Sequence, residues 1–349
     1  MLRETLSLRG LLGFERSEIE DSLHRLRLRD RAALSQASVI KIGEDLDAEE
    51  ILFGSFSATK AASGDSAGSL KISARILDRR HMRLGPEFLE TGALEDLTTV
   101  EAHLAWRVLT ALAPASAPPE ADFKSLRPAV RLDAEESYAR GLLARDPAQR
   151  EKFFLQAARL DARPAHAAYQ LGQMHYQRKD YREAAEWLVK VPAEDPHFRA
   201  AHFLLGLAQF QSGDFAGAEK SFQTIAETVP IGAVMNNLGA AVSRLNQPAR
   251  AIEDFRKAVS ADEQDPVYQF NLAYALWKKG DFSEAADHFR AVLDHDANDQ
   301  MATLLLGRCL KKQGFHAGVD LRLAALEKLK SEYQERAYWQ LKAVLAAKP

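Results

Sequence analysis

The sequence has little of several features that would place it in a specialised class. Only one of its 349 residues is a cysteine, Cys309, which excludes an intramolecular disulfide framework. It has no run of eighteen apolar residues, so we expect no membrane span. Lysine and arginine total 46 against 49 for aspartate and glutamate, and the net charge of -3 predicts no nucleic-acid partner. The composition is therefore that of an ordinary globular protein.

Side chains that could carry chemistry do not occur at the spacing that chemistry needs. Ten histidines are present, but no pair stands at i, i+4 beside a glutamate, and no second cysteine is available for zinc. The segment Asp294–Asn298 begins like a calcium loop, yet Asp299 stands where that loop needs glycine. The acyl-transfer spacing in Ser57–Lys60 lacks its partner motifs. We therefore predict no catalytic residue, metal or cofactor, and no enzyme.

A short motif, leucine followed by glycine, returns along the second half of the chain at steps of about 34 residues. With one alanine in the series, its small residues are Gly172, Gly206, Gly239, Ala273 and Gly307. A second set of small residues follows each of the first four by twelve positions: Ala184, Ala218, Ala251 and Ala285. Four positions later come large apolar residues: Leu188, Phe222, Phe255 and Phe289. The pattern predicts pairs of helices that cross closely at the small residues.

This pattern resembles the tetratricopeptide repeat over roughly residues 165–315, because both the period and the small and large positions match. The resemblance implies a mainly α fold, an α-solenoid of helical hairpins that presents a concave binding groove. We expect a degenerate first repeat over 134–164, because Gly141 lies closer to Gly172 than the regular step allows. Regular repeats then cover 165–198, 199–232, 233–265 and 266–299, and a last one starts at 300–315, within a solenoid spanning 131–315. A capping helix is expected over 316–349, with an apolar stripe between Leu326 and Val344.

Residues 1–113 have a mixed pattern, which predicts a small α/β domain. Helical spacing of apolar residues occurs over 17–27, 34–46 and 94–112, and strand patterns occur over 51–57 and 70–78. The glycine-containing stretch 61–69 between the strands predicts a hairpin loop. A proline-rich passage begins at Pro114, and we expect residues 114–130 to be a linker.

The segments Ala48–Phe56 and Leu70–Asp78 resemble the N-terminal α/β module, TolB-N-like or CsgG-like, that precedes tetratricopeptide repeats in bacterial proteins. Members of that family open with a further strand and helix, so residues 1–113 are predicted to be N-terminally incomplete. A missing strand would leave a sheet edge exposed. As written, the start of the chain lacks a secretory signal and predicts a cytoplasmic protein; a lost signal would make it periplasmic.

The resemblance also predicts which side chains line the concave groove. On the first helices these form an aromatic groove that ends in a basic rim: Tyr169, Gln173, Tyr176, Phe203, Leu207, Phe210, Asn236, Asn237, Arg244, Phe270, Asn271, Tyr274, Trp277, Lys278, Arg308, Lys311 and Lys312. Asn237 and Asn271 occupy the position from which family members hydrogen-bond a peptide backbone. Packing of the aromatic residues in the core is an equally weighted alternative.

These patterns favour a non-enzymatic scaffold that binds a protein or peptide in the groove. The carboxylate-clamp subset of the family is disfavoured, because apolar residues such as Phe203 and Phe270 stand where that clamp needs basic residues or asparagine. An alternative is a ligand-sensing or assembly protein, in which residues 1–113 carry the activity and the repeats act as a tether. Partner identity and oligomeric state are left open by the sequence.

Overall fold

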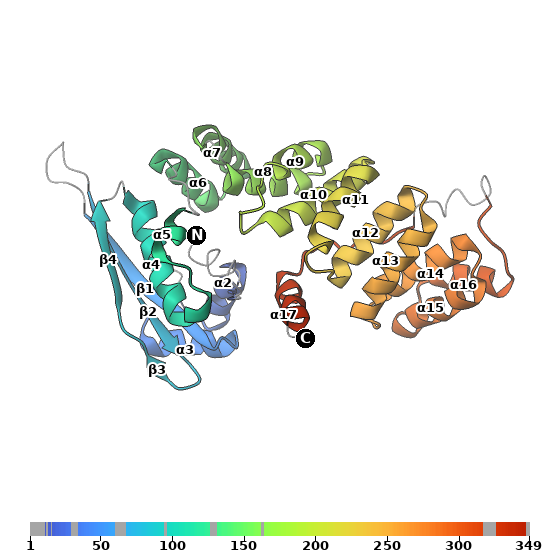
Figure 1. The fold of residues 1–349 in the computed structure, drawn as a ribbon, viewed down its shortest axis with the longest axis horizontal. Coiled ribbons are helices and arrows are strands. Elements are labelled where there is room, and N and C mark those ends of the chain that lie inside the picture. Colours follow the sequence, from blue (N-terminus) through green and yellow to red (C-terminus); the bar gives the residue numbers. More distant parts are fainter. Residues whose placement is uncertain are drawn as a thin grey trace. The chain divides into compact units, whose positions relative to one another are not determined.

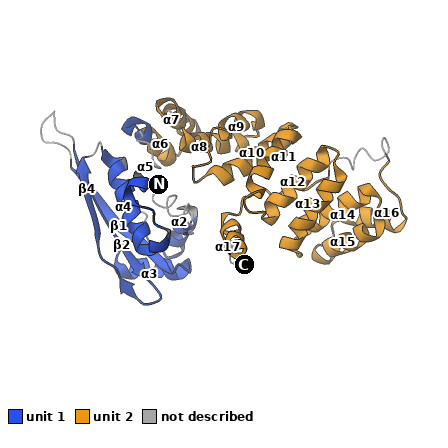
Figure 2. Cartoon of the chain, viewed as in Figure 1, with its two compact units in different colours: residues 1–136 blue, residues 137–349 orange. Residues whose placement is uncertain are grey.

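The computed structural model describes residues 11, 13–14, 16–28, 34–59, 68–93, 96–125, 131–161, 164–316 and 326–346. The chain divides into two compact units, 1–136 and 137–349, which Figure 2 shows in different colours. Each unit has its own hydrophobic core. The predicted order, a small α/β part followed by a mainly helical part, is confirmed. In the part of the chain that the structure describes, no helix has the length and apolarity needed to cross a bilayer.

The sheet of the first unit is organised around its second strand, β2 (Ser69–Asp78). On one side β2 pairs antiparallel with β1 (Glu50–Thr59), as expected for a hairpin, although residues 60–67 of its loop lie outside the described residues. On the other side β2 pairs with β4 (Phe88–Ala93) and, at its end, with β3 (Arg83–Leu84). The sequence did not predict β3 and β4, because one is very short and the other has a single buried residue, Phe88.

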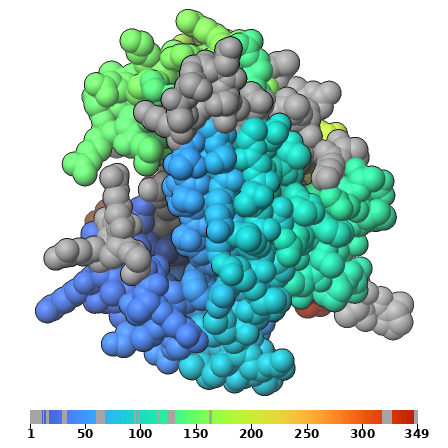
Figure 3. All heavy atoms as spheres, turned by 90° about the vertical axis from the view of Figure 1, so that its left-hand side faces the viewer, coloured from blue at the N-terminus to red at the C-terminus, as the bar shows by residue number. Residues whose placement is uncertain are grey.

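One helix covers one face of this sheet. Helix α4 (Leu97–Leu112) contributes Leu104 and Val108 to a core with Ala74, Ile76 and Phe88. The alternate residues of β2 are polar as far as Arg75, and the strands lie open at the surface in Figure 3, where they are blue to cyan. At the end of the strand, Leu77 on the same face is fully buried. Such alternation is typical of an antiparallel sheet with one solvated face. The predicted helices near the start are present as α2 (Arg16–Arg25) and α3 (Gln36–Asp45).

The proline-rich segment after α4 is structured as far as Ser125, whereas the sequence predicted a linker over 114–130. It contains a 3-10 turn (Pro114–Ser116) and helix α5 (Glu120–Ser125). Trp106 Nε1 donates a hydrogen bond to the Pro118 carbonyl at 3.0 Å, and Phe123 is buried beside Ala105 and Leu109. The apolar side chains in this segment are sufficient to dock it on α4. Residues 126–130 lie outside the description.

The second unit consists of successive helical hairpins, which Figure 1 shows from green to orange. The bounds of their helices are α6 (Leu132–Leu143), which crosses the unit boundary, α7 (Pro147–Leu160), α8 (Ala165–Gln177), α9 (Tyr181–Leu188), α10 (Phe198–Ser212), α11 (Phe215–Ala226), α12 (Gly232–Arg244), α13 (Pro248–Ala261), α14 (Pro266–Lys279), α15 (Phe282–His295) and α16 (Gln300–Leu310). The hairpins lie in the order of their sequence, and two core clusters fill the space between their helices, one over α8 to α10 and one from α10 onward.

The repeated glycines lie where the two helices of a hairpin approach each other. A Cβ added at Gly206 would stand 2.7 Å from the Phe222 ring, and one at Gly239 would stand 2.8 Å from the Phe255 ring. These distances are too short for real carbon contacts, so an alanine at either position would have to displace the buried ring. Gly307 differs, because an added Cβ would meet no described atom within 4 Å. The second helix expected to cross at Gly307 would fall largely in residues 317–325, which lie outside the described residues, so the close crossing there stays a prediction.

The end of the chain is different from the long capping helix that its apolar stripe predicted. Of its described residues, Glu335–Ala346 are helical, as α17, while the described residues before them, Leu326–Gln334, have no regular secondary structure. Residues 317–325 of the predicted helix lie outside the description. Leu326, Leu329 and Tyr333 still pack against the core, but from a non-helical backbone whose polar groups bond side chains of α12 and α14.

Candidate peptide-binding site

The predicted groove residues fall into three groups by exposure. Most of those on α10, α12 and α14 are almost fully buried: Phe203, Leu207, Asn236, Asn237, Phe270, Asn271, Tyr274 and Trp277. Tyr169, Gln173, Tyr176, Phe210 and Arg308 are half-buried, and Arg244, Lys278, Lys311 and Lys312 are exposed. The first group is buried partly because residues 326–334 of the same chain lie across it. We call the surface of α10, α12 and α14 that contacts these residues the inner face, and Leu326–Gln334 the tail strand.

Three asparagines of the inner face hold the main chain of the tail strand. Asn271 Nδ2 donates to the Lys328 carbonyl at 2.7 Å, and the Lys328 amide donates back to Asn271 Oδ1 at 2.8 Å. Asn237 does the same with Lys330, at 2.9 Å and 2.8 Å. Asn236 Nδ2 adds a second donor to the Lys328 carbonyl at 2.9 Å. Because each amide both donates and accepts, the orientation of its oxygen and nitrogen is fixed.

The asparagines also bond to one another. Asn271 Nδ2 donates to Asn236 Oδ1 at 2.8 Å, and Asn236 Nδ2 donates to Asn237 Oδ1 at 3.1 Å. All three side chains are fully buried. A buried amide without partners is costly, so this network requires either the tail strand or another chain with free main-chain groups in the same place.

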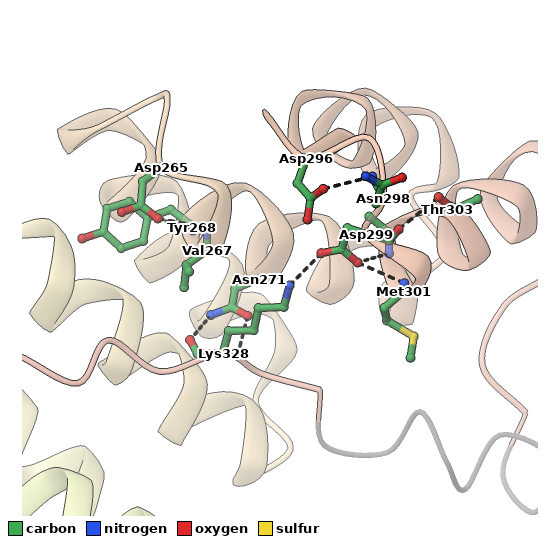
Figure 4. A network of polar contacts seen from close by, with 11 residues as sticks. Asp265, Val267, Tyr268, Asn271, Asp296, Asn298, Asp299, Met301, Thr303 and Lys328 are labelled. Carbon is green, nitrogen blue, oxygen red and sulfur yellow. Dashed lines mark hydrogen bonds and ion pairs between the residues drawn. The ribbon is translucent and has the colours of Figure 1, made fainter. Parts of the chain in front are cut away.

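Two lysines of the tail strand reach aspartates at the starts of α14 and α16. Lys328 Nζ lies 3.0 Å from Asp299 Oδ2 and 3.8 Å from the centre of the Phe270 ring. Figure 4 shows Lys328 between Asn271 and Asp299. Lys330 Nζ lies 2.5 Å from Asp265 Oδ2. Both aspartates use their other oxygen to cap a helix, since Asp265 Oδ1 accepts from the Val267 amide and Asp299 Oδ1 from the Ala302 amide, each at 2.9 Å.

These contacts shift the titration of Asp299. Its partial burial acts to raise the pKa, but hydrogen bonds from the Ala302 amide and from Lys328, together with the charge of Lys328, hold the pKa of this carboxyl below its usual value. Asp299 therefore remains ionised at neutral pH and keeps its attraction for the lysine.

The carboxylate of Glu327 enters the inner face beside these lysines. Its side chain is only 1% exposed, and Ser243 Oγ donates to its Oε1 at 2.6 Å. Lys278 Nζ lies 3.9 Å from the same oxygen. Its other oxygen is buried and has no hydrogen-bond partner among the described residues. This is a binding position for an acid, formed by one hydroxyl and one cation.

Aromatic and charged contacts hold the end of the tail strand and the start of α17 against α10. The Tyr333 ring lies 5.7 Å from the Phe203 ring, and burial raises the pKa of the Tyr333 hydroxyl. Arg199 pairs with Glu335 and lies over the Tyr338 ring at 4.2 Å. The tail strand therefore crosses the repeats in reverse, from α16 and α14 to α12 and then α10.

Two other predicted groove residues have aromatic partners away from the tail strand. Tyr169 stacks on His197 at 4.7 Å, and Tyr176 lies against Tyr181 at 5.5 Å, both at the start of the second unit. The expected basic rim is dispersed: Arg308 lies 5.9 Å from the Trp277 ring, while Lys278 is near Glu327.

The sequence did not predict a role for Ser243, Asp265, Asp299 and Glu327. Two of them carried a usable signal, because Asp265 and Asp299 are one repeat step apart and each precedes a first helix. Glu327 carried no such signal, since its position depends on the non-helical course of the tail strand.

A separate group of metal-competent side chains lies between α8 and α10. His166 Nε2 is 3.5 Å from Asp195 Oδ2, and His197 Nδ1 is 3.2 Å from Asp195 Oδ1. Their ligand atoms all lie within 4.8 Å of one another. The sequence did not reveal this group because His166 is on a different helix from the turn that carries the other two. In this structure Asp195 Oδ1 accepts from the His197 amide at 2.8 Å, which accounts for its position as a turn-forming residue.

The repeat architecture agrees with a comparison to known families. The family profile described as tetratricopeptide repeat matches residues 189–230, 203–266, 236–300 and 270–318. The chain contains tetratricopeptide repeats. These repeats support a role as a protein–protein interaction scaffold. No part of these profile matches includes residues 1–113, so the TolB-N-like or CsgG-like nature of that region remains a prediction.

Curated proteins with similar sequences match over part of their length. Protein FlbA of Caulobacter vibrioides is 30% identical over 172 residues, which are 47% of this chain and 28% of FlbA. The human cell division cycle protein 16 homolog is 27% identical over 117 residues, 31% of this chain and 19% of that protein. The chain thus spans less than a third of the length of either relative.

Two solved structures have some similarity to this chain. A fragment of MamA from Desulfovibrio magneticus is 22% identical, with a TM-score of 0.43, over 49% of this chain and 99% of that one. YrrB, described as a TPR protein with an unusual peptide-binding site, is 20% identical, with a TM-score of 0.40, over 49% of this chain and 88% of that one.

Proposed function

We propose that this chain is a non-catalytic scaffold whose inner face holds an extended segment of a partner protein through its main chain. The observation that carries the proposal is the two-way hydrogen bonding of Asn271 with Lys328 and of Asn237 with Lys330. Main-chain groups are common to every peptide, so contacts of this kind serve for binding another chain as well as for holding the tail strand.

The spacing of these contacts favours an extended occupant. Residues 328 and 330 are bonded, and residue 329 between them bonds neither asparagine. In an extended chain alternate residues point the same way, whereas a helix uses its own amides and carbonyls internally. The inner face is therefore suited to a strand, which enters with free amides and carbonyls.

A photo-crosslinking experiment tests this function in the native host. A crosslinking amino acid at position 278, beside the tail strand, is expected to capture a partner protein. The same group at Lys220, on the outer helix α11, serves as the matched control. Capture from position 220 with none from position 278 would contradict binding at the inner face.

A second candidate is assembly through the first unit. Within the described residues β1 pairs only with β2, so its other edge is open, and Phe56 on this strand is 78% exposed. An open edge can accept a strand from another chain. This observation favours the alternative in which residues 1–113 carry the interaction; loss of partner capture on Phe56→Lys, with the inner face intact, would support it.

A further inference from the structure

Two consecutive repeats of the inner face contact alternate residues of the tail strand, Lys328 and Lys330. Asn237 and Asn271 are one repeat step apart, as are Asp265 and Asp299, so each asparagine stands at the same spacing from its aspartate. Asn271 and Asp299 together hold Lys328, by its main chain and its ammonium group, and Asn237 and Asp265 together hold Lys330. A step of one repeat along the helices thus corresponds to a step of two residues along the tail strand.

The same register shows where this arrangement ends. One repeat earlier, Phe203 and Ile231 stand at the positions of the asparagine and the aspartate, and one repeat later Leu305 replaces the asparagine. Neither neighbouring repeat can thus form the two-way hydrogen bonds that Asn237 and Asn271 make with the main chain. Only two lysine positions are therefore specified, and beyond them the strand is recognised by the apolar contact between Phe203 and Tyr333.

The acid position adds a third requirement. Glu327 is buried next to Ser243 and Lys278, immediately before the first specified lysine. A neutral or basic residue there would leave the Lys278 ammonium without its partner, and an aspartate is one methylene shorter. By contrast, Ser331 and Glu332 are exposed, so the inner face does not select the residue type at the two positions before Tyr333.

We propose, on the basis of the function above, that the partner segment carries the pattern Glu-Lys-Leu-Lys-x-x-Tyr in extended form, with leucine between the lysines because Leu329 packs against the core, and that the tail strand occupies its place in the free protein. Charge pairing with Asp265 and Asp299 selects lysine at two alternate positions. A tethered segment has a high effective concentration, so a partner must displace the tail strand and binds the intact chain with reduced apparent affinity.

The test uses the full chain and a fluorescent peptide with the sequence of residues 326–346. In one protein variant, Lys328→Glu with Lys330→Glu places acids opposite Asp265 and Asp299 and so weakens the tail strand while leaving the inner face unchanged. This variant is expected to bind the peptide at least about tenfold more tightly than the unmodified chain. A peptide with the same two lysines changed to glutamate is expected to bind the variant at least about tenfold more weakly.

A matched change on the inner face checks the lysine contacts. Asp265→Asn with Asp299→Asn, added to the variant, keeps the helix caps but removes the charges, so the preference for lysine over glutamate should disappear. If the variant unfolds, Tyr333→Ala offers a second way to weaken the tail strand, and its folding is checked by circular dichroism.

Two outcomes would overturn the proposal, and they have different meanings. Equal binding of the lysine and glutamate peptides would refute the sequence pattern while leaving main-chain binding intact. A folded variant that binds neither peptide would refute binding of a partner strand at the inner face altogether, and with it the proposed function.

Discussion

Asn271 and Lys328 exchange two hydrogen bonds, one in each direction, although they are far apart in the sequence. This pair shows how a repeat scaffold can hold a strand that belongs to no sheet. The asparagine side chain offers one donor and one acceptor to the main chain of the tail strand, as a residue of a neighbouring strand does in an antiparallel sheet. Asn237 repeats the arrangement one hairpin earlier, on the Lys330 main chain.

Replacing Asn271 by alanine should destabilise the protein. The change leaves the Lys328 amide and carbonyl with fewer partners and breaks the bond to Asn236, so we expect a loss of about 1–3 kcal/mol in the free energy of unfolding. Urea denaturation followed by circular dichroism measures this. Asn298→Ala, at an exposed turn, is the control and should change stability by less than about 0.5 kcal/mol. Equal effects of Asn271→Ala and Asn298→Ala would show that the hydrogen bonds of Asn271 do not contribute to the free energy of unfolding.

Acid should weaken the attachment of the tail strand through Asp299. The pKa of this carboxyl is lowered in the folded protein from its ordinary value of 3.8. A lowered pKa stabilises the folded state above the ordinary value, and the stabilisation is lost as pH falls through the folded pKa. Stability measured between pH 6 and pH 3 should therefore decline less steeply in Asp299→Asn, which keeps the helix cap, than in the unmodified chain. Parallel declines would contradict the ion pair with Lys328.

The glycines give a pair of opposite predictions. Gly239→Ala places a Cβ 2.8 Å from the buried Phe255 ring and should cost about 1–3 kcal/mol, because neither helix can move freely. Gly307→Ala meets no described atom within 4 Å and lies inside a helix, so it should be neutral or stabilise by up to about 1 kcal/mol. Thermal unfolding compares the two. A loss of stability in Gly307→Ala would show a close neighbour at that position.

The aromatic residues proposed for the groove should behave as core residues. Phe270 and Tyr274 are both 0% exposed. Phe270→Ala is expected to cost about 3–5 kcal/mol in the free energy of unfolding, as for other buried phenylalanines. Phe56→Ala, at a site that is 78% exposed, is the control and should have little effect on stability. If Phe270→Ala left stability unchanged, its side chain would be available to a partner.

The helical hairpins were predictable because their positions depend on local spacing. Glycine, alanine and phenylalanine recur with the repeat, and close packing leaves each of them few substitutes. Of the three asparagines that bond the tail strand, Asn237 and Asn271 were also predicted from the sequence as positions that contact a peptide backbone. The repeat period could not show whether Phe270 and Trp277 pack in the core or line the groove, because either role requires the same face of the helix.

The tail strand could not be predicted from local pattern. Leu326, Leu329, Tyr333 and Ala337 have helical spacing, and the sequence therefore predicted a helix. The structure decides against it through bonds from Asn236 and Asn237 to residues 92 and 93 positions away. Such long-range partners override local propensity and leave no periodic signal of their own. For the same reason the buried position of Glu327 was not foreseen.

Hydrogen exchange at the amides of Lys328 and Lys330 tests the central claim most directly. Both amides donate to asparagine side chains of the inner face, so we predict slow exchange in the unmodified chain. In the variant Asn237→Ala with Asn271→Ala, exchange at both sites should become fast, while the amides of α12 and α14 stay protected. Fast exchange of Lys328 and Lys330 in the unmodified chain would show that the inner face does not hold a strand by its main chain.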